Sequence, residues 1–299
     1  DGNDIERLQV VLEEAKKSTC CTLVHIKTKK GCGYKYAEDK PESYHSVGAF
    51  DPDEGVAVPG GDDYSSVFGK ALCAHAAKDE RICAITAAMR DGTGLRTFSE
   101  QFPERFFDVG IAEEHAVAFA GGLAVSGLLP VCALYSTFAQ RTYDQLIHDV
   151  ALQKLHMVLA LDRAGFVAGD GETHQGVFDC SFLSEIPGVE IYAPDSFEEL
   201  ETALTRAIAG TGISVLRYPR GGMSTYDRTA FVPFNAQSAS YFSVCDRFSS
   251  QTPELALVTY GKETAQVFAA AKCLSEKGIS VRIVKLFRVF PVKDYALYL

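Results

Sequence analysis

Three stretches of the sequence gather side chains that could perform acid–base or phosphate chemistry. The first is residues 108–122, where Glu113 and Glu114 stand at a predicted helix start just after a strand. The second is residues 135–145, which place an aromatic side chain at a strand end and an arginine one turn into a helix. Carboxylates in a first helical turn also complement the helix dipole, a structural role worth under about 1 kcal/mol.

The third stretch is a loop of small residues, 162–176, that carries Arg163, Asp170 and His174. Its glycines allow the backbone to approach a ligand closely. A loop histidine near an aspartate is a candidate general acid or base near neutral pH. The structural alternative is an ordinary turn with capped ends.

A regular alternation of strands and helices from about residue 63 to residue 219 must position these stretches. The pattern requires right-handed crossovers, and therefore an α/β fold with a parallel sheet covered by helices on both faces. Ligands bind such sheets beyond the ends of the strands, where all three stretches lie. Strands are predicted at 81–87, 105–110, 129–136, 156–162, 189–194 and 213–219, and helices at 64–78, 95–102, 113–126, 138–152 and 197–209.

The flanking segments predict partial domains. Residues 1–62 begin with a helix that a capping box at Asn3 and Glu6 would start, then a strand at 21–28 and a long irregular stretch. Two strands and one helix cannot cover both faces of a parallel sheet, so the last unit is expected to be incomplete. The predicted divisions are 1–62, 63–226 for the central domain, 227–254 as a linker with little periodicity, and 255–299 for the start of a further domain.

Composition excludes several classes of partner. The chain has 299 residues and a formal net charge of -10, which argues against binding nucleic acid or an anionic membrane. No apolar run is long enough to span a membrane. The nine cysteines include no CxxC pair, which indicates reduced thiols rather than a metal site or a disulfide framework. Four of them lie in apolar stretches and are expected to be buried: Cys73, Cys83, Cys132 and Cys273.

The three stretches, in this order, carry a family resemblance. "IAEEHAV", "YSTFAQRTYDQ" and "DRAGFVAGDGETHQG", flanked by "KKGCGYKYAEDKP" and "RYPRGG", resemble the 1-deoxy-D-xylulose-5-phosphate synthases, which are transketolase-like thiamine-diphosphate enzymes. The resemblance covers nearly the whole chain. It implies that residues 1–62 end a diphosphate-binding domain, that 63–226 form a pyrimidine-binding domain, and that 255–299 begin a C-terminal domain.

The resemblance implies a role for five residues in binding thiamine diphosphate. Glu113 would hydrogen-bond a ring nitrogen of the cofactor's aminopyrimidine, which favours the tautomer that generates the nucleophilic ylide. Phe138 would stack on the pyrimidine. Ile111 would line the same pocket, and Tyr34 and Arg141 would make further cofactor contacts.

The resemblance also implies the substrates. Pyruvate would add to the ylide and lose carbon dioxide, and the two-carbon unit would pass to glyceraldehyde 3-phosphate. Arginine suits phosphate because its planar guanidinium donates two parallel hydrogen bonds. Tyr135, Arg163 and Arg220 are expected to contact the acceptor and its phosphate. Asp170 and His174 would position the acceptor hydroxyl and transfer protons, and His45 matches another active-site histidine of the family.

The sequence Gly169–Gly171, GDG, resembles the start of a thiamine metal motif but lacks the asparagine that should follow. The only asparagines are Asn3 and Asn235, and neither has the required spacing. The ligands of Mg²⁺ are therefore expected in a segment before Asp1, and the chain alone is expected to be inactive. The resemblance further implies a homodimer when complete, located in a bacterial cytoplasm or a plastid stroma, that begins isoprenoid-precursor, thiamine and pyridoxal biosynthesis.

Two other interpretations remain open. The chain could be a separate pyrimidine-domain subunit of a transketolase or of a 2-oxo-acid dehydrogenase, which would take its diphosphate domain from another chain. It could also be a non-catalytic remnant that pairs with a full-length partner, because pocket residues can persist in an inactive fragment.

Overall fold

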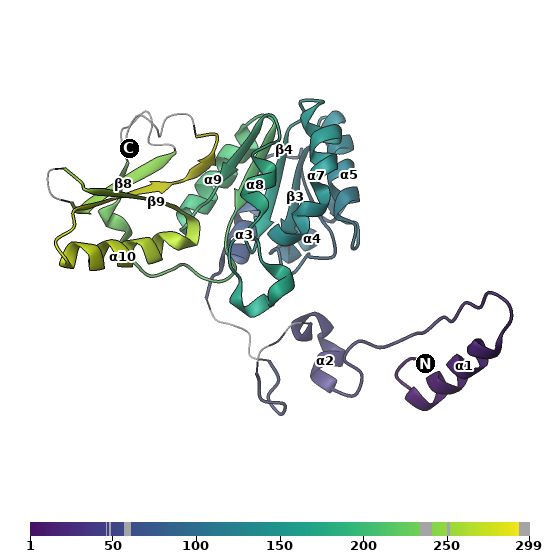
Figure 1. Ribbon diagram of the computed structural model, residues 1–299. Helices are drawn as coiled ribbons and strands as arrows, with labels where there is room; N and C mark the ends of the chain where they lie inside the picture. The colour runs from purple at the N-terminus through teal and green to yellow at the C-terminus, as the bar shows by residue number, and fades with distance from the viewer. Residues whose placement is uncertain (46, 48, 57–60, 234–240, 250–251, 293–299) are drawn as a thin grey trace. The chain divides into compact units, whose positions relative to one another are not determined.

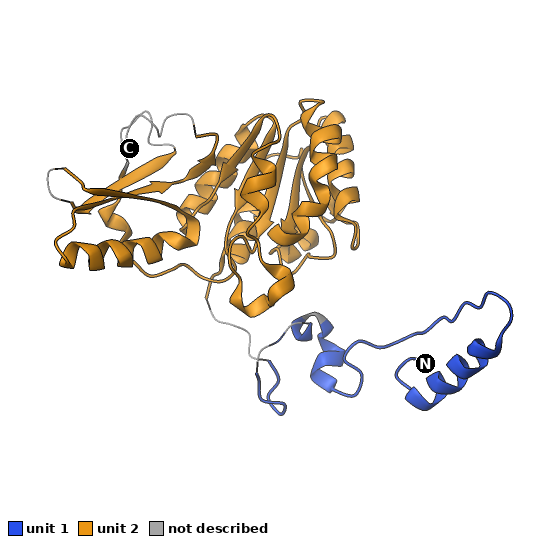
Figure 2. Cartoon of the chain, viewed as in Figure 1, with its two compact units in different colours: residues 1–60 blue, residues 61–299 orange. Residues whose placement is uncertain are grey.

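The computed structural model describes residues 1–45, 47, 49–56, 61–233, 241–249 and 252–292 (Figure 1). The chain divides into two compact units, residues 1–60 and residues 61–299 (Figure 2). The larger unit contains the α/β fold with a parallel sheet that the sequence predicts.

The smaller unit contains one longer helix. Helix α1, Ile5–Lys17, begins after Asp4, whose carboxylate accepts a hydrogen bond from a first-turn amide. The predicted capping box at Asn3 and Glu6 is therefore wrong. The Asn3 side chain instead accepts a hydrogen bond from the Lys29 amide at 2.8 Å.

Residues 21–28, predicted as a strand, form none. A strand needs a neighbour to complete its ladder of hydrogen bonds, and the described residues of this unit provide no such partner. Helix α2, Lys35–Asp39, and a short helical turn, Pro41–Tyr44, follow.

Seven strands form the main sheet of the larger unit, in the order β11-β5-β6-β4-β3-β1-β2. Six of them run parallel, and β11 pairs with β5 in the antiparallel sense at one edge. The six parallel strands match the six predicted apolar runs. Their bounds are β1 Ile82–Thr86, β2 Phe106–Asp108, β3 Leu129–Tyr135, β4 Met157–Asp162, β5 Val189–Tyr192 and β6 Ile213–Arg217, with β11 at Arg288–Phe290.

Helices cover both faces of this sheet (Figure 1). In β3, Val131 belongs to the apolar cluster that includes side chains of helices α3 and α9, and Cys132 belongs to the cluster that includes those of α5. Successive side chains of a strand point to opposite faces, so a strand covered on both sides is apolar along its length. The helix bounds are α3 Tyr64–Ala76, α4 Arg96–Gln101, α5 Glu113–Val125, α8 Asp179–Leu183 and α9 Phe197–Ala209.

The helix predicted over residues 138–152 is interrupted, so the prediction of one continuous helix is wrong. The Thr142 hydroxyl donates to the Ala139 carbonyl at 2.7 Å, which competes with the regular helical ladder. Four short segments replace it: α6 Ser136–Ala139, a tight turn Gln140–Thr142, α7 Tyr143–Gln145 and a π-helical segment Leu146–Ala151.

Residues 227–254, predicted to be a linker with little periodicity, contain a regular strand that joins a second sheet. The sequence pattern missed this strand because only Phe242 and Cys245 of it are fully buried. The order of the second sheet is β7-β8-β10-β9, with β8 antiparallel and β9 parallel to β10. The elements are β7 Val232–Pro233, β8 Phe242–Phe248, β9 Leu255–Tyr260, helix α10 Thr264–Glu276 and β10 Val281–Leu286.

All nine cysteines are free thiols. Cys73, Cys83 and Cys132 are buried as predicted, but Cys273 is exposed, so that prediction is wrong. Cys273 lies on the outer side of α10, two residues after Ala271, which is buried against the second sheet.

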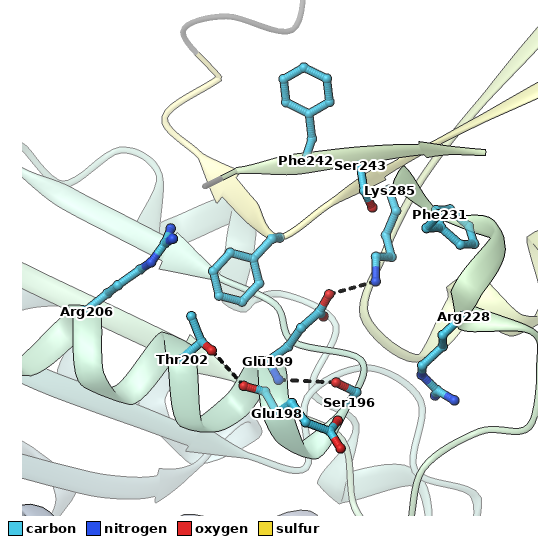
Figure 3. Close-up of a pocket in the computed structure, with 11 residues that line it drawn as sticks. Ser196, Glu198, Glu199, Thr202, Arg206, Arg228, Phe231, Phe242, Ser243 and Lys285 are labelled. Atoms are coloured by element: carbon cyan, nitrogen blue, oxygen red, sulfur yellow. Dashed lines mark hydrogen bonds and ion pairs between the residues drawn. The ribbon is translucent and has the colours of Figure 1, made fainter. Parts of the chain in front are cut away.

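A buried lysine of the second sheet pairs with two acids that follow strand β5. Nζ of Lys285, on β10, lies 2.7 Å from Oε1 of Glu199 (Figure 3) and 3.1 Å from Oδ1 of Asp195. Lys285 is 6% exposed and Asp195 2% exposed. Beside this ion pair lies a cavity of about 400 Å³, and none of the site residues predicted from the sequence lines it among those that the structure describes.

Replacement of this lysine should destabilise the larger unit. In Lys285→Met, the buried carboxylate of Asp195 and the partly buried carboxylate of Glu199 would lose the lysine that pairs with both, which should cost roughly 3 kcal/mol of unfolding free energy. Urea denaturation followed by circular dichroism measures this loss. The control is Lys272→Met, at an exposed position of α10; equal stability of the two variants would contradict the structural role of Lys285.

Candidate active site

The predicted site residues of the larger unit lie at the carboxyl ends of its parallel strands. Tyr135 ends β3, Arg163 directly follows β4, and Arg220 lies three residues after β6. Glu113 opens helix α5, which follows β2. Because the strands run parallel, their carboxyl ends meet at one edge of the sheet and bring these side chains toward each other.

Glu113 is a buried acid that contacts a predicted partner. It is 2% exposed, and its Oε2 accepts a hydrogen bond from Nη1 of Arg141 at 2.9 Å. The guanidinium of Arg141 also lies 5.1 Å from the centre of the Phe138 ring. The structure thus brings three of the predicted cofactor residues together, with Arg141 in contact with both of the others.

Aromatic rings continue from Phe138 toward the loop. The Tyr135 and Phe138 rings stack with centres 6.0 Å apart, and the His174 ring meets Phe138 edge-on at 5.2 Å. Tyr135 leaves no room for a side chain at position 92, because a Cβ on Gly92 would lie 1.8 Å from the Tyr135 hydroxyl. Gly92 is therefore a site residue that the sequence reasoning missed.

Asp170 bridges the two predicted phosphate-binding arginines. Its Oδ2 accepts a hydrogen bond from Arg163 at 2.7 Å, and its Oδ1 accepts one from Arg220. The guanidinium of Arg163 also stacks 3.8 Å from the centre of the Tyr135 ring. The Asp170 side chain is only 3% exposed, so its charge is balanced by the two cations rather than by water.

The loop between β4 and α8 is braced internally. The amides of Gly165 and Gly176 each donate to the other's carbonyl, at 2.7 and 2.9 Å. Inside this closure, the Gln175 side chain accepts from the Val167 amide at 2.8 Å and donates to the Gly171 carbonyl at 2.6 Å. No sequence motif indicates Gln175, because its role depends on contacts within a folded loop.

Asp162 is a second buried acid that the sequence reasoning did not select. It is the last residue of β4 and has no exposed surface. Its Oδ2 accepts a hydrogen bond from the Ser65 hydroxyl at 2.6 Å. Burial raises the pKa of Asp162 to about 7, although the Ser65 hydrogen bond and Arg163 favour the ionised form.

For three predicted residues, the structure gives no contact with the other side chains of the site among the described residues. Ile111 is 82% exposed, and its place in the cofactor pocket stays a prediction. Tyr34 and His45 belong to the smaller unit, where the Tyr34 hydroxyl donates to the Pro52 carbonyl at 2.8 Å and His45 lies 3.1 Å from Nζ of Lys30. Their catalytic roles also stay predictions.

The described residues contain no group of three or more His, Cys, Asp or Glu side chains that could hold a metal ion. Within the same part of the chain, no helix is long and apolar enough to cross a membrane. The side chains gathered at the sheet edge are a buried carboxyl, stacked aromatic rings and a paired arginine cluster.

Comparisons with known proteins agree with this architecture. Residues 62–225 match the family model of the transketolase pyrimidine-binding domain, and residues 247–297 match that of the transketolase C-terminal domain. The chain is 44% identical over 98% of its length to a protein named 1-deoxy-D-xylulose-5-phosphate synthase from Clostridium kluyveri. It is 45% identical over 98% of its length to one from Caldanaerobacter subterraneus. It spans 46% of the length of either relative.

Two solved structures are similar. A split-gene transketolase, described as an inactive beta4 tetramer, has a TM-score of 0.62 at 26% identity, over 76% of this chain and 72% of the other. A transketolase from Campylobacter jejuni has a TM-score of 0.68 at 20% identity over 81% of this chain and 39% of the other, which shows a shared fold alone. Because the pyrimidine-domain model matches more than half of its residues, this chain belongs to the family of the transketolase pyrimidine-binding domain.

Proposed function

We propose that the complete protein is a 1-deoxy-D-xylulose-5-phosphate synthase, which decarboxylates pyruvate and transfers the two-carbon unit to glyceraldehyde 3-phosphate. The observation that carries the proposal is the sheet edge itself. There the buried carboxyl of Glu113 lies near the Phe138 ring, and Tyr135 stacks on that ring and lies beside His174. Next to them, Asp170 accepts hydrogen bonds from two arginines. The 44% identity to relatives of that name supports it.

The carboxyl group of Glu113 and the ring of Phe138 suit the aminopyrimidine of thiamine diphosphate. Glu113 already accepts a hydrogen bond from a planar nitrogen donor, and Phe138 already holds that planar group against its ring. An aminopyrimidine is likewise planar and carries nitrogen atoms at its rim. When bound, thiamine diphosphate supplies a nucleophilic carbon that adds to 2-oxo acids.

Glu113 would exchange a proton between its carboxyl oxygen and the pyrimidine ring nitrogen. Its burial at the first turn of α5 excludes water from that proton, which makes the exchange selective for the bound ring. Phe138 would hold the ring plane against the sheet edge. Arg141 would move from its present contact with both residues to a position beside the cofactor.

The arginine cluster would bind the acceptor. Arg163 and Arg220 would donate to the phosphate of glyceraldehyde 3-phosphate, and Asp170 would keep both guanidinium groups in place. His174 stands beside Phe138 and Tyr135, between the cofactor side and the cluster. It would transfer a proton to or from the acceptor oxygen, which makes it the natural general acid of the transfer step.

Other features of the complete enzyme are part of the same proposal. Mg²⁺ would hold the diphosphate through ligands outside this chain, so residues 1–299 alone are expected to lack decarboxylase activity. The complete form would be a homodimer of the bacterial cytoplasm or the plastid stroma, and it would supply isoprenoid, thiamine and pyridoxal precursors.

A separate pyrimidine-domain subunit is the second candidate. The similarity to a split-gene transketolase over 72% of that chain favours it. The identity to that protein is 26%, however, against 44% to the synthases over nearly the whole chain. The synthase is therefore the better supported proposal.

Removal of the Glu113 carboxyl should abolish catalysis. The host is a chimera in which this chain replaces the matching segment of the Clostridium kluyveri synthase. In that chimera, Glu113→Ala should lower kcat for pyruvate-dependent release of carbon dioxide by roughly 100-fold or more, because the proton exchange is lost. The control is Glu114→Ala, which removes an exposed carboxylate from the same helical turn. Near-normal turnover of Glu113→Ala would remove this acid from the mechanism.

Loss of one arginine of the cluster should weaken acceptor binding selectively. Arg220→Gln should raise KM for glyceraldehyde 3-phosphate by roughly ten- to a hundredfold, since a charge-assisted hydrogen bond contributes about 1.5–3 kcal/mol. KM for pyruvate should stay unchanged, and so should the use of unphosphorylated glyceraldehyde. Arg247→Gln, which breaks an exposed arginine–aspartate pair in the second sheet, is the control. An equal loss with both aldehydes would contradict phosphate binding by Arg220.

A further inference from the structure

Asp162 is a buried acid next to Arg163 of the arginine cluster. It has no exposed surface, and its Oδ2 accepts a hydrogen bond from the Ser65 hydroxyl, while the Arg163 backbone also favours its charged form. Its other oxygen, Oδ1, has no hydrogen-bond partner among the residues that the structure describes. A buried carboxylate with an unsatisfied oxygen is costly, whereas a carboxylic acid in the same place carries no charge.

The surroundings of Asp162 contain several further unsatisfied polar atoms. At the carboxyl ends of β3, β4 and β6, the Ser136 hydroxyl, Nε of Arg163 and the Tyr218 hydroxyl are buried and lack partners in the described part of the chain. Buried water commonly satisfies such groups in folded proteins. The Ser136 and Tyr218 hydroxyls can accept as well as donate, so a proton on Asp162 has acceptors available in these groups or in such a water.

The charged and titratable groups that face Asp162 have opposite effects on its pKa. Arg163, on the loop, favours the carboxylate, whereas Asp63, before α3, favours the acid. Tyr135 on β3 and Tyr218 after β6 also face it, and the pKa of each is raised, first by burial and further by Asp162. Burial is the largest influence on Asp162, and it brings the pKa of this acid to about 7.

Protonation of Asp162 decides the charge of the region where the acceptor would bind. Arg163 and Arg220 carry two positive charges, and Asp170 neutralises one of them. With Asp162 neutral, one positive charge remains for an anion. With Asp162 ionised, the formal charges of the two arginines and the two aspartates sum to zero.

We propose that Asp162 is a positioning residue that holds a proton next to the Arg163–Asp170–Arg220 cluster and thereby preserves its positive charge for a phosphate group. The acceptor and the binding of its phosphate by the cluster rest on the proposed function, whereas the proton on Asp162 is argued from its burial and its unpartnered oxygen. Phosphate binding should weaken as the pH rises through neutrality, because ionisation of Asp162 adds a negative charge next to Arg163.

Two measurements on the chain itself test the proton and its effect. Carbon-13 NMR of aspartate side-chain carboxyl groups should show one that titrates near neutrality, and Asp162→Asn should remove that signal. Binding of inorganic phosphate should then be followed by calorimetry. Between about pH 6 and about pH 8, the wild type should lose roughly three- to tenfold in affinity relative to Asp162→Asn.

The variants separate this effect from other causes. The ratio to Asp162→Asn cancels the second ionisation of phosphate itself, and asparagine keeps the acceptor for the Ser65 hydroxyl. Ser65→Ala removes a bond that favours the carboxylate, so it should move the weakening to higher pH. Asp144→Asn, at a position with a 74% exposed side chain, should match the wild type.

Two results would overturn the proposal. One is the absence of any carboxyl that titrates near neutrality and disappears in Asp162→Asn. The other is an identical pH dependence of phosphate binding in the wild type and Asp162→Asn. Neither readout needs turnover, so an inactive chimera would contradict the proposed synthase activity and leave this inference standing.

Discussion

The burial of the main sheet on both faces is the constraint on which the rest of this protein depends. Helices α3 and α9 cover one face and α5 covers the other, so the strands between them are mainly apolar. The charged groups of the candidate site therefore lie where the strands end. Parallel strands place those ends at one edge, which is why residues far apart in sequence, such as Glu113 and Arg220, belong to one region of the fold.

At that edge, buried carboxylates are neutralised by arginine side chains rather than by contact with water. Glu113 and Asp170 are both almost fully buried, and each contacts an arginine that is partly exposed. A buried acid that meets a half-exposed base can exchange this partner for a ligand without leaving a charge unsatisfied. Asp162 differs from them, because its side-chain partner among the described residues is the Ser65 hydroxyl rather than a guanidinium.

The sequence predicted the parts of the fold that local patterns control. The six parallel strands follow from their continuous apolar runs, and helix α9 follows from its amphipathic pattern with Ser196 as its cap. The motifs placed Tyr135, Phe138, Arg163, Asp170 and His174 close to one another. The predictions from sequence were wrong where contacts between distant residues determine the structure. Strand β8 depends on pairing with β10, and residues 21–28 pair with no strand in the part of the chain that the structure describes. The bracing by Gln175 and the burial of Asp162 arise only once the loop and α3 have packed.

Arg163 adopts a left-handed backbone conformation, with φ of 61°, which is unusual for a residue with a long side chain. Such a conformation costs on the order of 1 kcal/mol, and glycine would relieve it. Glycine would also delete the guanidinium that stacks on Tyr135 and pairs with Asp170. Selection for thermal stability alone should therefore favour glycine or asparagine at this position. Under the proposed function, such stabilised proteins would bind the acceptor phosphate more weakly, so the strained dihedral of Arg163 is a place where stability and the proposed activity oppose each other.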